Sequence, residues 1–161
     1  MSKSVKRVQR AAEAAGLNIE LRRLGEDTRT AAAAAAALGI EVGRIAKSLV
    51  FFGQSSGELV LLLVSGTNRA CLDRAAAAAG EALVQANPQE VRQRSGFVIG
   101  GVAPLGHLEP PRVYIDETLQ DFSTVWAAGG APDAVFEITP QDLIAATGGR
   151  VVDLAEQEAS A

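Results

Sequence analysis

Two strand-length apolar runs, separated by a short polar segment, constrain the fold of this 161-residue chain more than any other feature. Residues 45–52 read IAKSLVFF and residues 58–65 read ELVLLLVS. Between them, residues 53–57 read GQSSG, which has the composition of a turn. Strands that are apolar on both faces are typical of the covered interior of a sheet. We therefore expect a central β-hairpin with other elements packed on both of its faces.

Further helices and strands are predicted on both sides of this hairpin. Helical spacing of apolar residues, alanine-rich runs and polar caps predict helices over residues 5–15, 31–37, 72–79, 88–95 and 142–146. Alternating or apolar segments predict shorter strands over residues 18–24, 97–99, 112–116, 124–127, 134–138 and 151–154. Because several strands are joined by tight turns, we expect a single α+β domain over residues 1–154: a mixed, largely antiparallel sheet forming a partly closed barrel with surrounding helices. Residues 155–161 are expected to be a frayed acidic tail.

Charge argues against one class of function. With 15 Lys and Arg and 19 Asp and Glu, the net charge of −4 does not fit a strongly basic nucleic-acid-binding protein. A local basic patch stays compatible with that total, and Lys3, Lys6, Arg7 and Arg10 form such a face on the predicted first helix. Such a face is most often solvated, although it can contact RNA phosphates.

Single copies of cysteine and histidine exclude several kinds of site. Cys71 alone cannot form an internal disulfide or a multi-thiolate metal site, and His107 alone cannot supply a paired-histidine zinc motif. The sequence contains neither a membrane-length apolar run nor the apolar region of a secretory signal. We therefore expect a soluble, cytoplasmic protein that does not bind membranes.

Lys47 is the most informative single residue, because it interrupts an apolar strand. A buried ammonium without a partner is costly, so Lys47 must reach water, meet a carboxylate, or line a cavity where a ligand supplies negative charge. Lys47 and Ser48 resemble the end of a phosphate-binding loop, G-x-x-x-x-G-K-[ST]. Ala46 replaces the second glycine of that motif, and the lysine opens a strand rather than a helix, which disfavours a phosphate-loop enzyme.

The segment from Gly100 to Gly106, GGVAPLG, is a second candidate feature. Backbone N–H groups of such a stiff loop can point at one acceptor and hold a carbonyl or an oxyanion. The alternative is a tight connection between two strands. His107 follows the loop and is interpreted as a surface or packing residue. Asp116 and Glu117 end a predicted strand and are expected to be solvated, since adjacent strand residues point to opposite faces.

These features occur together in a known family. The chain resembles the YbaK/ProX family, which is similar to the editing domain inserted in bacterial prolyl-tRNA synthetases, in five segments between Thr28 and Leu154: TRTAAAAAAALGIEVGRIAKSLVFF, LVLLLVSG, SGFVIGGVAPLGH, YIDETL and ITPQDLIAATGG–VVDL. The resemblance implies a deacylase that hydrolyses the ester of a mischarged aminoacyl-tRNA, expected to be tRNAPro, and a fold like that editing domain. It implies no metal or organic cofactor, and prolyl-tRNA synthetase as a further partner.

The resemblance also implies roles for individual residues. Lys47 would hold a phosphate or carbonyl oxygen at the tRNA 3′ end, and the backbone N–H groups of Gly101, Val102 and Ala103 would hold the carbonyl or its oxyanion. The terminal ribose hydroxyl would activate the water. The remaining candidate substrate-binding residues are Thr30, Ser48, Ser65, Asn68, Gly100, Pro104, Gly106 and His107.

Two questions stay open at this point. The amino acid removed can be alanine, serine, threonine, cysteine or a small non-protein amino acid, because the prolyl-tRNA specialists of this family differ in the side chains that line the pocket. Discrimination by one methylene is worth only about 1–3 kcal/mol, so a second sieve after the synthetase makes chemical sense. The alternative function is a binding module that holds an aminoacyl or nucleotide group without turnover.

Overall fold

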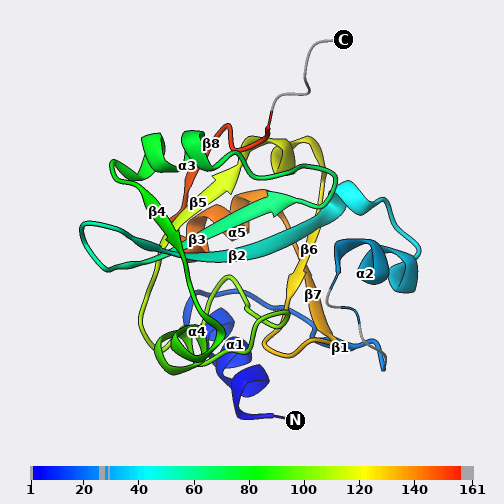
Figure 1. The fold of residues 1–161 in the computed structure, drawn as a ribbon. Coiled ribbons are helices and arrows are strands. Elements are labelled where there is room, and N and C mark those ends of the chain that lie inside the picture. Colours follow the sequence, from blue (N-terminus) through cyan, green and yellow to red (C-terminus); the bar gives the residue numbers. More distant parts are fainter. Residues whose placement is uncertain (1, 26–27, 29, 157–161) are drawn as a thin grey trace.

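The computed structural model describes residues 2–25, 28 and 30–156 (Figure 1). In this part of the chain the helices are α1 (Lys3–Ala14), α2 (Ala31–Leu38), α3 (Leu72–Ala79), α4 (Pro88–Ser95) and α5 (Pro140–Thr147), with 3₁₀ turns η1 (Val42–Arg44) and η2 (Glu117–Asp121). The strands are β1 (Arg22–Arg23), β2 (Ile45–Gly53), β3 (Leu59–Ser65), β4 (Leu83–Gln85), β5 (Arg112–Asp116), β6 (Val125–Ala128), β7 (Ala134–Ile138) and β8 (Arg150–Val152).

All the described strands belong to one mixed sheet, in the order β1-β7-β6-β2-β3-β5-β8, with β4 paired to β2 outside this path. The pairs β1–β7, β6–β7, β2–β3 and β2–β4 are antiparallel, while β2–β6, β3–β5 and β5–β8 are parallel. The two outer strands of this order do not pair with each other, so the barrel is open. The predicted architecture of a mixed sheet with surrounding helices is confirmed.

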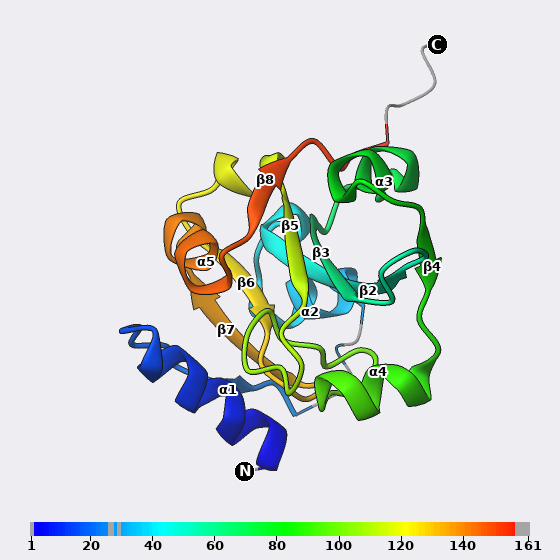
Figure 2. The same cartoon turned by 90° about the vertical axis from the view of Figure 1, so that its left-hand side faces the viewer.

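The predicted hairpin lies at the centre of this sheet. β2 and β3 pair in register from Ala46–Ser65 to Phe52–Leu59, and every residue of β3 is buried. On one face Leu61 and Leu63 pack with residues of α1, α4 and α5. On the other face, α3 packs over Val60 and Leu62, while α2 packs over Ile45. Figure 2 shows α3 at one end of the sheet, with α1 and α4 at the other.

Capping residues at both ends explain why the bounds of most helices can be predicted from the sequence. Thr30, Asn87 and Thr139 accept hydrogen bonds from the first turns of α2, α4 and α5. Glycines in the left-handed conformation end the same helices, as expected for a C-terminal glycine. For α1 the cap is Ser2, so the helix begins at Lys3, two residues before the predicted start at residue 5.

Three strand predictions need correction. Residues 97–99 are not a strand: Phe97 turns into the core while Val98 and Ile99 are exposed, and the chain then reverses through a turn. Of residues 18–24, only Arg22 and Arg23 pair, at the edge of the sheet beside β7. The three-residue strand β4 was not predicted, because so short a segment carries no periodic signal.

The C-terminal segment is held as far as residue 156. The last strand covers Arg150–Val152 rather than residues 151–154. Ala155 forms an isolated bridge with Ala70, and the backbone N–H of Glu156 donates to the carbonyl of Arg69. The rest of the predicted tail, residues 157–161, lies outside the described residues. No helix in the described part of the chain has the length and apolar character needed to cross a membrane.

The central position of β3 yields a stability prediction. We expect Leu63→Ala to lower the free energy of unfolding by about 2–5 kcal/mol, because it removes a fully buried side chain and leaves a cavity. Leu108→Ala is the matched control, since Leu108 is 61% exposed, and it should change stability by less than about 0.5 kcal/mol. Urea unfolding measures both, and equal losses would contradict the assignment of β3 to the core.

Candidate functional site

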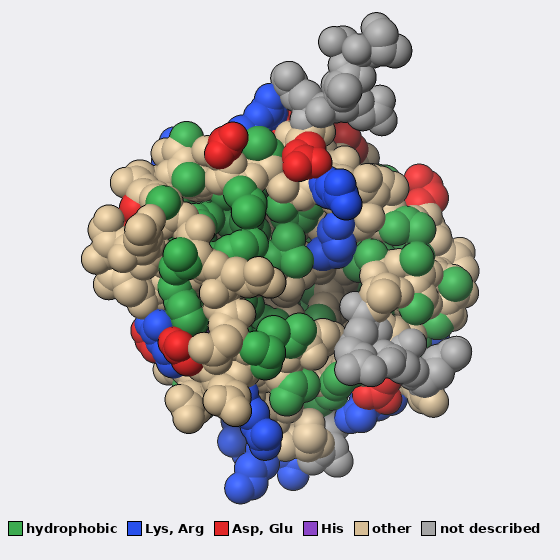
Figure 3. Space-filling view, in the orientation of Figure 1, with side chains coloured by type: hydrophobic (Ala, Val, Ile, Leu, Met, Phe, Trp, Pro, Cys, Tyr) green, Lys and Arg blue, Asp and Glu red, His purple; other side chains and the backbone are tan. Residues whose placement is uncertain are grey.

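A cavity of about 420 Å³ opens beside β2, where α2, β6, β7 and the loop after α4 converge. Figure 3 shows this face of the molecule hollowed near its centre. Its walls are mostly apolar, and small alanine side chains of α2 leave room above the strand. The lining residues that bear on the argument are Thr28, Thr30, Lys47, Ser48, Gly100, Val102 and Trp126.

The cavity exists because the sheet is interrupted at one edge of β2. This edge pairs with β6 only through Ile45 and Ala46, and with β4 only from Phe51 onward. Residues 47–50 therefore have no strand partner on this side in the part of the chain that is described. The loop containing Ile99, Gly100 and Val102 lies across the gap, and a second cavity of about 170 Å³ continues along the same edge.

The free edge directs main-chain groups of Ser48 toward these cavities. The N–H of Gly53 donates to the carbonyl of Glu58, and the N–H of Gly66 donates to the carbonyl of Ile45. In an antiparallel pair this pattern means that the odd-numbered residues of β2 direct their main-chain N–H and C=O groups toward β3. The even-numbered Ser48 must then point its N–H and C=O to the opposite, open edge. A ligand in the cavity can be bound by this N–H donor and this C=O acceptor.

Lys47 extends from the same strand and lines the cavity. Its Nζ donates a hydrogen bond of 2.5 Å to the backbone carbonyl oxygen of Asn68, in the turn that follows β3. No carboxylate lies within ion-pair distance of Nζ among the described residues. Lys47 therefore does not meet a carboxylate among the described residues; its ammonium lies at a cavity wall and is held by a carbonyl, and a ligand that supplies negative charge there stays a prediction.

A buried carboxylate organises the turn that holds Lys47. Asp116 is fully buried, and its carboxylate accepts from the N–H of Ser65 (3.0 Å), the Nδ2 of Asn68 (2.9 Å) and the N–H of Thr118 (3.0 Å). The expectation that Asp116 is a solvated strand-end charge is wrong. Its backbone partner Ser65 lies at the end of the neighbouring β3, a contact that only the assembled sheet creates.

The electrostatic environment of Lys47 lowers its pKa below the ordinary value of 10.5. Partial burial is the largest cause, because it disfavours the charged form. The charge of Asp116 opposes this effect, and the nearby Arg69 adds to it. The charge of Asp116 thus favours the charged form of Lys47 against the effect of burial.

The loop across the gap uses two glycines for different reasons. Gly100 has a φ of +93°, a backbone conformation that residues with a side chain rarely adopt. At Gly101 a Cβ atom would lie 2.8 Å from the carbonyl carbon of Ala131, so the close approach of two backbones requires glycine. The N–H of Gly101 donates to the carbonyl of Val98 (3.0 Å) and is occupied within its own turn.

Helix α1 fixes both ends of this loop from outside the cavity. Arg7 donates from Nε to the carbonyl of Gly106 (2.6 Å) and from Nη2 to the carbonyl of Gly96 (2.8 Å), and its guanidinium lies 4.8 Å from the centre of the Phe97 ring. Ser4 donates to the carbonyl of Gly130 in the neighbouring loop (2.7 Å). The cavity loop is therefore held by three contacts from one arginine.

His107 belongs to this packing rather than to the cavity lining. Its ring meets Phe97 edge-on at 5.0 Å, and its Nε2 lies 2.6 Å from the carbonyl oxygen of Ala103, to which it donates. Burial is the largest cause of a lowered pKa at His107, which favours the neutral ring. The interpretation of His107 as a packing residue fits these contacts better than a role in substrate binding.

The predicted site residues fall into two groups. Thr30, Lys47, Ser48, Gly100 and Val102 line the cavity, whereas the others lie behind it. Ser65 and Asn68 belong to the network around Asp116, and Ser65 also donates from Oγ to the carbonyl of Gly43. The remaining members, which pack behind the lining or toward α1, are Gly101, Ala103, Pro104, Gly106 and His107.

Sequence reasoning missed three cavity residues of note. Thr28 lines the cavity and donates to the carbonyl of Pro132 (2.8 Å). Trp126 and Pro132 complete the wall beneath α2. Of these three, only Trp126 could have been singled out from the sequence, because it is the one tryptophan of the chain and lies in a predicted strand. No group of His, Cys, Asp or Glu suited to holding a metal ion occurs among the described residues.

Comparison with known proteins gives consistent matches. Residues 25–146 match the family described as "Aminoacyl-tRNA editing domain". A crystal structure described as "a putative trans-editing enzyme for prolyl tRNA synthetase" shares 49% identity and superposes with a TM-score of 0.91 over 98% of this chain and 99% of that one. "Putative Cys-tRNA(Pro)/Cys-tRNA(Cys) deacylase EbsC" of Enterococcus faecalis is 28% identical over 83% of this chain and 81% of its own. "Uncharacterized protein YwhH" of Bacillus subtilis is 34% identical over 68% and 69%.

The network around Lys47 predicts opposite effects of two neutralising substitutions. Asp116→Asn should lower the pKa of Lys47 further by removing an attractive charge, and Arg69→Gln should raise it by removing a repulsive one. An NMR titration of the lysine ε-methylene groups measures both, with Lys47→Met to assign the signal. Shifts of the same sign in the two variants would contradict this electrostatic account.

The close approach at Gly101 predicts a coupled displacement of two loops. Gly101→Ala should lower the free energy of unfolding by about 1–3 kcal/mol, because its Cβ would overlap the backbone of Ala131. Amide chemical-shift changes should appear in both the 99–103 and 129–133 segments. Gly148→Ala is the control, because it adds backbone strain at a φ of +65° while its Cβ would have no atom within 4 Å. The chemical-shift changes of this control should stay near α5. Changes at Gly101→Ala confined to its own loop would contradict the contact.

Proposed function

Because this chain belongs to the aminoacyl-tRNA editing domain family, we propose that it is a trans-editing deacylase that hydrolyses the ester of a mischarged aminoacyl-tRNA. The observation that carries the proposal is that Lys47 and Val102 both line one cavity at an interrupted strand edge. A cation and a backbone donor in one small apolar cavity suit an ester with a phosphodiester attached. Prolyl-tRNA synthetase is the proposed partner enzyme, and the cytoplasm the proposed compartment.

The proposed substrate is tRNAPro that carries a small wrong amino acid. Support comes from two relatives, one described as "a putative trans-editing enzyme for prolyl tRNA synthetase" and the other named "Putative Cys-tRNA(Pro)/Cys-tRNA(Cys) deacylase EbsC". The alanines of α2 with Val102, Trp126 and Pro132 leave an apolar space suited to a small side chain. Such walls select mainly by bulk, which fits a second sieve acting after a synthetase.

The proposed chemistry needs little from side chains, since an aminoacyl ester is already activated. Water attacks the carbonyl carbon, the bond to the ribose oxygen breaks, and that oxygen receives a proton; free amino acid and deacylated tRNA result. The neighbouring ribose hydroxyl is the proposed relay for the proton of the water. Lys47 holds a phosphate or carbonyl oxygen and orients the ester against the water.

The proposed oxyanion donor narrows to one residue. The resemblance implied the N–H groups of Gly101, Val102 and Ala103, but the N–H of Gly101 is occupied by Val98, and Ala103 lies behind the cavity lining. Val102 lines the cavity, and its N–H has no backbone acceptor among the described residues. The free C=O of Ser48 is the proposed acceptor for the α-ammonium group of the substrate.

Substitution of Lys47 tests this proposal. Lys47→Met keeps the apolar stem and removes the cation, and it should lower kcat/KM for a mischarged tRNAPro by about 100-fold, the scale of losing one transition-state contact. Arg150→Met is the control for loss of an exposed cation on β8 and should retain wild-type activity. The assay uses purified protein with tRNAPro charged in turn with cysteine, alanine, serine and threonine.

The same panel separates hydrolysis from binding without turnover. Release of the amino acid from at least one charged tRNA is the result expected of a deacylase. Saturable binding with every ester left intact would support the binding module instead. Full activity of Lys47→Met would refute the role proposed for the lysine while leaving the activity itself established.

A further inference from the structure

Helix α1 carries a row of cations that the proposed chemistry does not use. Lys3, Lys6 and Arg10 are exposed, and their spacing of three and four residues places them along one side of the helix. We call these three residues the α1 basic row. None of them forms an ion pair with a described residue, and the one acidic residue of α1, Glu13, accepts a hydrogen bond from Gln9.

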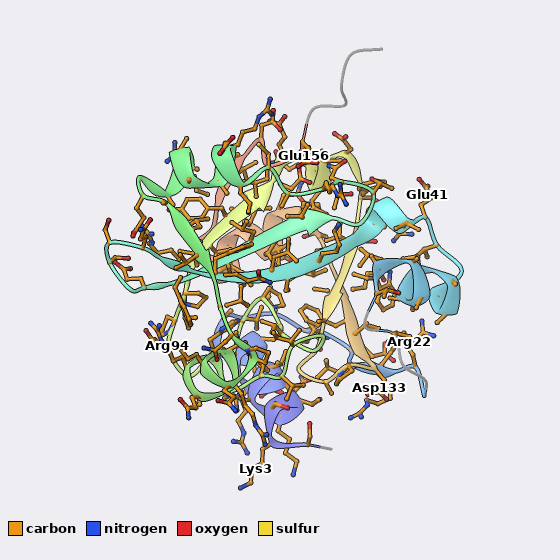
Figure 4. All side chains as sticks on the ribbon, in the orientation of Figure 1. Lys3, Arg22, Glu41, Arg94, Asp133 and Glu156 are labelled. Carbon is orange, nitrogen blue, oxygen red and sulfur yellow. The ribbon has the colours of Figure 1, made fainter. Side chains whose placement is uncertain are left out.

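The α1 basic row lies next to the cavity loop. Arg7, on the same side of the helix, bonds to the carbonyls of Gly96 and Gly106, which bracket the segment that covers the open edge of β2. Figure 4 labels Lys3 at the lower end of the molecule, and Figure 3 shows Lys and Arg side chains gathered there, below the hollow on the same face. The row and the cavity are therefore accessible from one side.

We propose that the α1 basic row binds the sugar-phosphate backbone of an RNA whose 3′ end occupies the cavity. This inference rests on the proposed function. A protein with a net charge of −4 repels RNA unless cations gather where the RNA lies, and the row supplies three unpaired cations beside the loop. In an aminoacyl-tRNA, the acceptor stem adjoins the 3′ end and is the segment within reach of this helix.

Two features bear on what the α1 basic row binds: the burial of the apolar side of the helix, and the position of the helix relative to the family match. The apolar side of α1, with Val5, Val8 and Ala12, is fully buried against the core, so the helix has no apolar face left to insert into a lipid bilayer. Helix α1 also precedes residues 25–146, the part of the chain that matches the family. The family match therefore does not by itself imply the row.

A charge-matched pair of variants tests the proposal. Lys6→Gln with Arg10→Gln removes two cations from the row, and Arg74→Gln with Arg150→Gln removes two from α3 and β8. In Figures 1 and 2, α3 and β8 lie at the opposite end of the molecule from α1. Each double variant changes the net charge by −2, so a difference between them reports position rather than total charge. Unfolding curves check that all the variants fold.

The measured quantities are KM for a mischarged tRNA and the dependence of binding on salt. The row variant should raise KM several-fold with kcat unchanged, and should reduce the slope of log K against log salt by about 1.5 to 2. Adding Lys3→Gln should extend both changes. Hydrolysis of a minimal substrate, an aminoacyl ester of adenosine, should stay at the wild-type rate in every variant, because it lacks the acceptor stem.

The outcomes distinguish failure of this inference from failure of the proposed function. If the wild-type protein hydrolyses the charged tRNA but the row and control variants show the same KM and salt slope, the row does not bind RNA. A wild-type protein that hydrolyses neither tRNA nor minimal ester overturns the proposed function itself. Loss of binding to anionic vesicles in the row variant, with tRNA kinetics unchanged, would assign the row to a membrane and overturn the RNA proposal.

Discussion

Among the residues that the structure describes, no strand pairs with residues 47–50 of β2 on one edge, and the arrangement of the site depends on this gap. Backbone N–H and C=O groups that are left unpaired in a protein interior are costly, so such an edge must be covered or solvated. Here the pairing of β2 with β6 ends at Ala46 and its pairing with β4 begins at Phe51, and the Gly100 loop crosses the space between them. The cavity is the space that remains between this loop and the unpaired edge of β2.

Lys47 and Asp116 show how a charged pair is kept in an apolar fold without direct contact. The carboxylate is fully buried and satisfied by two backbone N–H groups and one amide, which offsets its desolvation. Asn68 links the two groups, since its side chain donates to Asp116 while its carbonyl accepts from Lys47. The ammonium is therefore positioned by a carbonyl and keeps a free side toward the cavity.

Local signals explain what the sequence could predict. The hairpin, the capped helices and the importance of Lys47 follow from near neighbours in the sequence: two apolar runs joined by a turn, capping residues, and a charge inside an apolar run. The covering loop, the burial of Asp116 and the cavity position of Trp126 depend on strands that meet only in the folded sheet. Residues 97–99 have the composition of a strand. However, Phe97 is buried in the core, where it contacts Arg7 and His107, so tertiary contacts override the local preference.

The contacts of α1 also bear on how the site can move. Arg7 bonds both ends of the cavity loop, Ser4 bonds the 129–132 loop, and Gly101 leaves no space between the two loops. Close-packed parts of this kind do not deform independently. Because the helix and the two loops are packed together in this way, widening the cavity mouth requires α1 and both loops to move together. Helix α1 therefore limits how far the entrance can open.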